Sequence, residues 1–116
     1  MSRLANSIFA VIAFAGLQSA QAACTYPPEV DVPDGKAATA AEMKDTNKAV
    51  KEYMAAVESY LACLDDEEKA LGDSVTDEQK KVHTAKHNAA VDALNAVAAR
   101  YNEQVQLFKK QGKPSN

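Results

Sequence analysis

Two long stretches of the chain carry apolar residues at helical spacing. In the first, the apolar side chains return every seven residues at Met43, Val50, Val57, Leu64 and Leu71. The second stretch has a matching stripe of mostly apolar side chains: His87, Val91, Leu94, Val97, Ala98, Tyr101, Val105 and Phe108. Repeats of this kind predict two amphipathic helices, each of which buries one face.

Local signals at the ends of both stretches define where the helices begin and end. Two segments have the spacing of a capping box, in which a threonine and an acid or amide three residues later bond reciprocally: 39–42 and 76–79. Gly72 ends the first helix and Gly112 the second. We therefore expect helices over about 40–71 and 77–111, and the short connection between them makes them antiparallel neighbours.

A proline-containing segment precedes the first helix. Three prolines exclude a helix there, and a tyrosine and two valines give the segment apolar side chains to bury: Pro27, Pro28, Pro33, Tyr26, Val30 and Val32. The sequence thus predicts an all-α fold, with an extended arm over 23–38 followed by a long antiparallel two-helix hairpin over 39–112.

Folding the hairpin about Ser74 determines which residues face each other. Antiparallel counting places Thr46 opposite Tyr101 or Asn102. Because two helices bury little surface, a chain this small normally needs a staple or a partner. We expect the first helix to be the middle member of a three-part layer, with the second helix on one side and the arm on the other.

The first 22 residues have the three parts of a secretory signal peptide. Arg3 provides a basic start, an apolar run follows over 8–17, and Ala20 and Ala22 stand where signal peptidase requires small residues. The apolar run is too short for a permanent membrane anchor. We therefore expect cleavage after Ala22 and an exported protein of the bacterial periplasm or the extracellular medium.

Cys24 allows a competing interpretation of the same region. It follows two alanines, as in the lipoprotein box, whose cysteine is lipidated and becomes the first residue of the mature protein. Gln21, however, stands where that box prefers leucine. A plain exported chain is the simpler interpretation, and lipidation of Cys24 is the alternative.

The charge of the chain argues against nucleic-acid binding, and its hydropathy argues against a membrane span. The formal net charge is −3, and removal of residues 1–22 takes away Arg3 alone, which makes the mature chain −4. Without a clustered basic stripe, the protein has no electrostatic reason to bind nucleic acid. After residue 23, no stretch is long and apolar enough to span a membrane.

The two cysteines of an exported chain are most simply interpreted as one disulfide, Cys24–Cys63. From Thr39 to Cys63 a helix climbs about 36 Å. The arm from Cys24 to Thr39 can reach about 46 Å when extended, so it can double back along the first helix. An intermolecular bridge, or a lipidated Cys24 with a free Cys63, are the alternatives.

Two histidines form a weak candidate metal site. His83 and His87 stand four residues apart on one helix face, a spacing at which zinc can be bound. No third ligand is evident nearby in the sequence, so a structural or surface role is the simpler interpretation. The acidic run over 65–68 is interpreted as solvated surface, because successive helical residues point in different directions and cannot converge on one ion. Weak binding of a divalent ion is the lesser alternative for this run.

Three asparagines recur every seven residues beside the second stripe, at Asn88, Asn95 and Asn102. Asparagine prefers caps and turns to helix interiors, so this row suggests hydrogen bonds to the arm or across an oligomer interface. A plain polar border of the core is the alternative. A nearby row of alanines would let another helix approach closely, which favours a homodimer forming a four-helix bundle: Ala85, Ala89, Ala93 and Ala96.

Three segments carry a resemblance: residues 60–64 (YLACL), His87-Asn88, and residues 100–104 (RYNEQ). In these segments, and over most of the mature chain, the sequence resembles short exported proteobacterial proteins of unknown function. The resemblance implies bacterial export. It implies no activity, cofactor or site residue.

The residues contain no recognisable catalytic constellation and no cofactor motif. Serine–histidine–acid arrangements, glycine-rich phosphate loops and the haem attachment motif are all missing from the sequence. We therefore expect a non-enzymatic periplasmic structural or protein-interaction subunit without a cofactor, acting on a protein partner. The alternatives are a holdase-like periplasmic chaperone or stress protein, and a weak metal-binding protein that uses His83, His87 and nearby acids.

Overall fold

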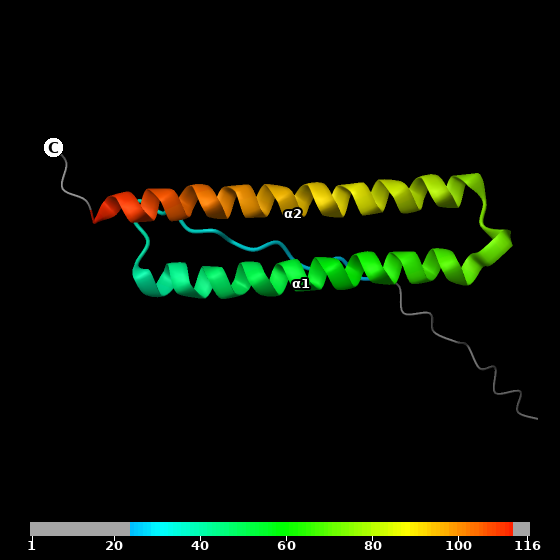
Figure 1. Ribbon diagram of the computed structural model, residues 1–116, viewed down its shortest axis with the longest axis horizontal. Helices are drawn as coiled ribbons and strands as arrows, with labels where there is room; N and C mark the ends of the chain where they lie inside the picture. The colour runs from blue at the N-terminus through cyan, green and yellow to red at the C-terminus, as the bar shows by residue number, and fades with distance from the viewer. Residues whose placement is uncertain (1–23, 113–116) are drawn as a thin grey trace, which may run out of the picture.

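In a computed structural model, which describes residues 24–112, the chain forms a long helical hairpin (Figure 1). Helix α1 spans Ala40–Leu71, a short 3-10 turn η1 spans Gly72–Ser74, and helix α2 spans Asp77–Gln111. This confirms the all-α hairpin fold. The expected signal peptide, 1–22, lies outside the described residues. Within 24–112, no helix is long and apolar enough to cross a membrane.

Both helices begin with a complete capping box. The Thr39 hydroxyl accepts from the Glu42 amide at 3.2 Å, while the Thr39 amide donates to the Glu42 carboxylate at 2.7 Å. Hydrogen bonds from the Thr39 backbone and side chain lower the pKa of Glu42. At the second helix, the Thr76 hydroxyl accepts from the Gln79 amide at 3.1 Å, and the Thr76 amide donates to the Gln79 side-chain oxygen at 2.8 Å. The first orphan amides of each helix are thus satisfied by nearby side chains.

The bend between the helices depends on Gly72. Its φ of 52° lies in the left-handed region, which a residue without a Cβ adopts at no steric cost. The Ser74 hydroxyl then donates to the Leu71 carbonyl, and the Val75 amide donates to the Gly72 carbonyl at 3.4 Å. The chain turns within a few residues, so α2 returns alongside α1.

The core is a narrow seam between the helices, in which medium-sized side chains meet small ones. Its buried members come from both helices: Val50, Tyr53, Val57, Ala90 and Val97. Val57 and Val97 are 0% and 2% exposed. The Asn47 amide donates to the Tyr101 hydroxyl at 2.8 Å across the seam. Because these two residues are equally far from Ser74 along the chain, the register agrees with antiparallel counting.

Candidate functional site

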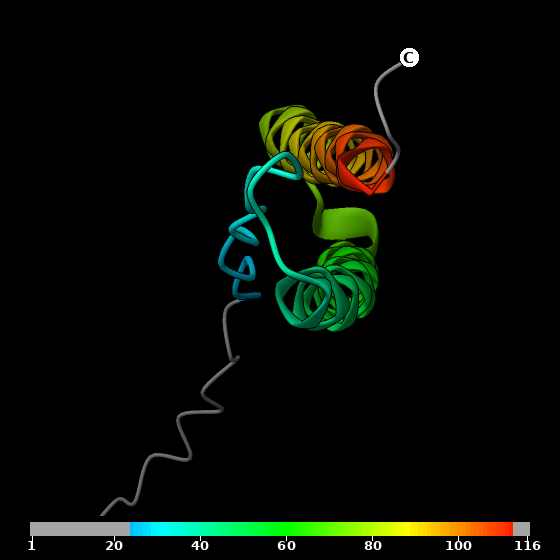
Figure 2. The same ribbon diagram turned by 90° about the vertical axis from the view of Figure 1, so that its left-hand side faces the viewer.

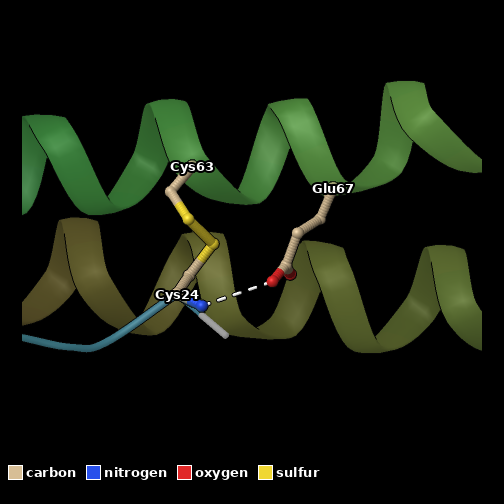
Figure 3. Close-up of a disulfide and its surroundings, with 3 residues drawn as sticks. All are labelled: Cys24, Cys63 and Glu67. Atoms are coloured by element: carbon tan, nitrogen blue, oxygen red, sulfur yellow. Dashed lines mark hydrogen bonds between the residues drawn. A yellow bond between two sulfur atoms is a disulfide. The ribbon is translucent and has the colours of Figure 1, made fainter. Parts of the chain in front are cut away.

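The Cys24–Cys63 disulfide joins the first described residue of the arm to α1, as expected from the sequence. The two Cα atoms are 5.7 Å apart, a separation within the usual range for this bond. The Cys24 amide also donates to a Glu67 carboxylate oxygen at 3.3 Å (Figure 3). With both sulfurs bonded to each other, neither an intermolecular bridge nor a lipidated Cys24 fits this structure.

Two tyrosines of α1 hold the next part of the arm. The Tyr26 hydroxyl lies 2.5 Å from the Tyr53 hydroxyl, and the Tyr26 ring meets the Tyr60 ring edge to face with centroids 5.3 Å apart. Burial, followed by the Tyr26 hydrogen bond, raises the pKa of Tyr53 to about 12. Both effects favour the neutral phenol of Tyr53.

Polar side chains of α2 hold the rest of the arm by its backbone. Arg100 donates to the Val30 carbonyl at 3.2 Å, and the Gly35 amide donates to the Gln104 side chain at 2.8 Å. The Gln111 amide group donates to the carbonyls of Gly35 and of Ala38, the latter at 3.1 Å. A Cβ at Gly35 would lie 2.0 Å from the Gln104 carbonyl oxygen, so the arm approaches α2 as closely as glycine allows.

The position of the arm therefore differs from the expected three-part layer. The arm lies along one side of the hairpin and contacts both helices, so α1 is not a middle layer (Figure 2). The physical reason is that α2 supplies the donors and acceptors that the extended arm needs for its own backbone groups. Hydrophobic spacing alone could not reveal this, because it reports apolar faces and not polar partners.

An apolar groove opens between the helices at the bend, beyond the point where the disulfide fixes the arm. It encloses about 230 Å³, and four aliphatic side chains line it: Leu64, Leu71, Val75 and Val82. Leu71 and Val82 are 38% and 45% exposed. Charged residues surround these side chains, with three acids and one lysine: Glu67, Glu68, Glu78 and Lys86. We call this feature the bend groove.

His83 stands at the edge of the bend groove and faces two carboxylates of α1. Its Nε2 lies 3.0 Å from Glu68 and 3.4 Å from Asp65. The sequence showed no third potential ligand near the histidines, whereas the fold brings these two carboxylates to His83. The Asp65 and Glu68 side chains nevertheless remain 52% and 36% exposed, which agrees with a solvated surface. Asp65 and Glu68 are three residues apart, so they share one helix face, which the opposite helix brings to His83.

His87 takes no part in that contact. Its ring is 6.4 Å from the His83 ring, centroid to centroid. Within 24–112, the only group of three donor side chains with ligand atoms within 4.8 Å of one another is Cys24, Cys63 and Glu67. The sequence pointed to His83 and His87 for metal, whereas the structure places its tightest donor group at the disulfide.

The asparagine row is exposed along α2. Asn88, Asn95 and Asn102 are all solvent-accessible, and none of the hydrogen bonds recorded among the described residues joins them to the arm. The side chains of α2 that bond to the arm are instead Arg100, Gln104 and Gln111. A role of the asparagines in an interface, like the homodimer itself, stays a prediction.

Comparisons of the chain with family models, with curated proteins and with solved structures find no match. The resemblance to short exported proteobacterial proteins stays a prediction. The functional argument therefore depends on the geometry of the arm and the bend groove.

Proposed function

We propose that the protein is a non-enzymatic interaction subunit of the bacterial periplasm, which contacts a protein partner through the bend groove. One observation carries this proposal: the described arm covers one side of the hairpin and stops at Cys63, so Leu71 and Val82 are left exposed beside a groove. Exposed aliphatic side chains around a concave site are typical of a binding surface.

The size of the bend groove favours a side chain over a small molecule. About 230 Å³ lies below the 300–1,000 Å³ typical of small-molecule pockets. One or two apolar side chains of a partner fill such a volume and act as the anchor of an interface. The hairpin then serves as a rigid rod that presents this end, because the seam and the arm stabilise its length.

The charges around the groove indicate the chemistry of the partner. Glu67, Glu68 and Glu78 outnumber Lys86 at its edge. Complementary charges steer association and exclude wrong partners. The partner segment is therefore an apolar anchor flanked by lysine or arginine.

A holdase-like chaperone, the alternative, receives less support. Such a protein needs a broad exposed apolar face, whereas the large apolar side chains that are more than a third exposed in residues 24–112 are few: Tyr26, Met54, Leu71 and Val82. Only the last two lie in the bend groove. A small, charged-edged groove suits one defined partner better than many unfolded chains.

Site-specific crosslinking in intact cells tests the proposal. A photo-reactive amino acid at Val82 is expected to give one adduct of defined mass, while the same amino acid at Met54, which is 39% exposed but lies outside the groove, gives none. The charge reversal Glu78→Lys should abolish the adduct, and Glu52→Lys, away from the groove, should not. No adduct at Val82, or the same mixture of adducts at both positions, would contradict the proposal, and the second result would favour the chaperone.

A further inference from the structure

The disulfide has the carboxylate of Glu67 beside it. Cys24 Sγ, Cys63 Sγ and a Glu67 carboxylate oxygen lie within 4.8 Å of one another (Figure 3). Cys63 and Glu67 are one helical turn apart, so both project from the same face of α1 toward the arm. Glu67 is exposed and both cysteines are half-buried, so solvent and ions have access to all three.

This donor set becomes available when the disulfide is reduced. A dithiol reductant supplies two electrons and two protons to the sulfur–sulfur bond and is itself oxidised to a disulfide. The two thiols that result can then lose their protons to a bound metal ion, because the thiolate is the metal ligand. Two thiolates and a carboxylate are a donor set suited to Zn²⁺.

The arm keeps its cysteine in place without the disulfide. Tyr26 holds the adjoining part of the arm through Tyr53 and Tyr60, and Gly35 is held by Gln104 farther along. None of these contacts involves a sulfur atom. Reduction therefore leaves the two thiols near each other instead of releasing the arm.

The change in geometry that zinc needs is small. With zinc–sulfur bonds of about 2.3 Å and tetrahedral angles, the two sulfurs stand about 3.8 Å apart. Rotation of the two cysteine side chains and a slight shift of the start of the arm give this separation. Glu67 exchanges its hydrogen bond to the Cys24 amide for the metal.

We propose that the reduced protein binds one Zn²⁺ through Cys24, Cys63 and Glu67, with the fourth position open to water. The arm is then stapled to α1 in two alternative ways, by a disulfide when oxidised and by zinc when reduced. The site does not include His83, but it shares Glu67 with the edge of the bend groove. Its test nevertheless differs from that of the proposed function, because zinc binding by the reduced thiols needs no groove partner.

Zinc competition against a chromophoric chelator tests the proposal on the full mature chain. In a phosphine reductant, the reduced protein is expected to take one equivalent of zinc from the chelator, and the oxidised protein none. Glu67→Gln should weaken zinc binding at least about tenfold, the lower end of what even an outer-shell partner costs. Glu58→Gln, an exposed acid on another face of α1, is the matched control and should bind as the wild type does.

Cobalt substitution supplies a second readout, because thiolate ligands give Co²⁺ a charge-transfer absorption that histidine and carboxylate ligands do not. Cys63→Ser should remove it. The proposal is overturned if the oxidised and reduced proteins bind zinc equally, which would place the ion at His83 with its carboxylates. It is also overturned if Glu67→Gln has no effect, or if the reduced chain loses its helical signal and zinc does not restore it.

Discussion

The Tyr26 hydroxyl of the arm and the Tyr53 hydroxyl of α1 lie 2.5 Å apart over the middle of the seam. Tyr53 is 3% exposed, so this hydrogen bond sits at the boundary between the core and the arm that covers it. Together with the disulfide, this hydrogen bond fixes the arm to the hairpin, and the arm residues that the structure describes do not line the bend groove.

Removal of the Tyr26–Tyr53 hydrogen bond should loosen the arm. Tyr53→Phe keeps the ring in the core and leaves the Tyr26 hydroxyl free to bind water, so we expect a loss of about 1 kcal/mol in the free energy of unfolding. Urea denaturation monitored by circular dichroism measures this. An unchanged midpoint would show that the contact adds nothing to stability.

The same residue predicts a loss of stability in alkali. The pKa of Tyr53 is raised to about 12 in the folded protein, against about 10 in an unfolded chain. Because the folded state favours the neutral phenol, its contribution is fully present below pH 10 and is lost as the pH rises from about 10 through 12. Denaturation midpoints measured across this window should fall more steeply for the wild type than for Tyr53→Phe. Parallel curves would contradict the assignment.

The disulfide should account for a large share of the stability. It joins residues that are 39 positions apart, and closing a loop of that length contributes about 4 kcal/mol by the chain-entropy estimate. The double variant Cys24→Ser/Cys63→Ser, which leaves no free thiol, should lose an amount of this order in urea unfolding. The wild type in a reductant with a chelator present is the matched control and should behave alike. A loss below about 1 kcal/mol would contradict the prediction, because the bond would then add little to the free energy of unfolding.

Because the arm packs closely against α2, a single methyl group added at Gly35 should lower the stability of the protein. In Gly35→Ala the new Cβ would meet the backbone of Gln104, so the arm must move and we expect a cost of about 1–3 kcal/mol. Gly112→Ala is the control, because nothing lies within 4 Å of its Cβ position. Hydrogen exchange of the arm amides should rise in the first variant only. Equal exchange in both would show that the arm is not held there.

The two kinds of asparagine should respond differently to truncation. Asn47→Ala removes the hydrogen bond to Tyr101 across the seam and should cost about 1 kcal/mol, while Asn95→Ala, at an exposed position, should leave monomer stability unchanged. Sedimentation of the Asn95 variant then tests the predicted interface. If the wild type self-associates and Asn95→Ala does not, the asparagine row belongs to that interface. If neither associates, the row is a solvated border of the core.

The parts of the structure that the sequence predicts are those with local or compositional signals. Both helices follow from apolar spacing and from the caps at Thr39 and Thr76, which act within one turn. The Cys24–Cys63 bond follows from the expectation of export, from the single pair of cysteines and from an arm long enough to connect them. Neither inference depends on how polar side chains from distant segments pair.

The remaining features depend on contacts between distant segments. The backbone of the arm is bound by three side chains of α2: Arg100, Gln104 and Gln111. Backbone groups are the same in every residue, so the sequence does not show which side chains they pair with. Carboxylates of α1 lie beside His83 and beside the disulfide: Asp65 and Glu68 at the first, Glu67 at the second. In the sequence these three residues look like an ordinary acidic surface. The bend groove is lined by side chains of both helices that meet only in the folded hairpin, so apolar spacing along the sequence does not locate it.

Intact mass spectrometry of the protein purified from the cell envelope without reductant tests the central claim, that an exported chain has its arm stapled to α1 by Cys24–Cys63. After alkylation of free thiols, the account predicts a chain that begins at Ala23 with no alkyl group. Prior reduction should instead give a chain with two alkyl groups. Two alkyl groups without reduction, or a diacylglyceryl group on Cys24, would contradict it.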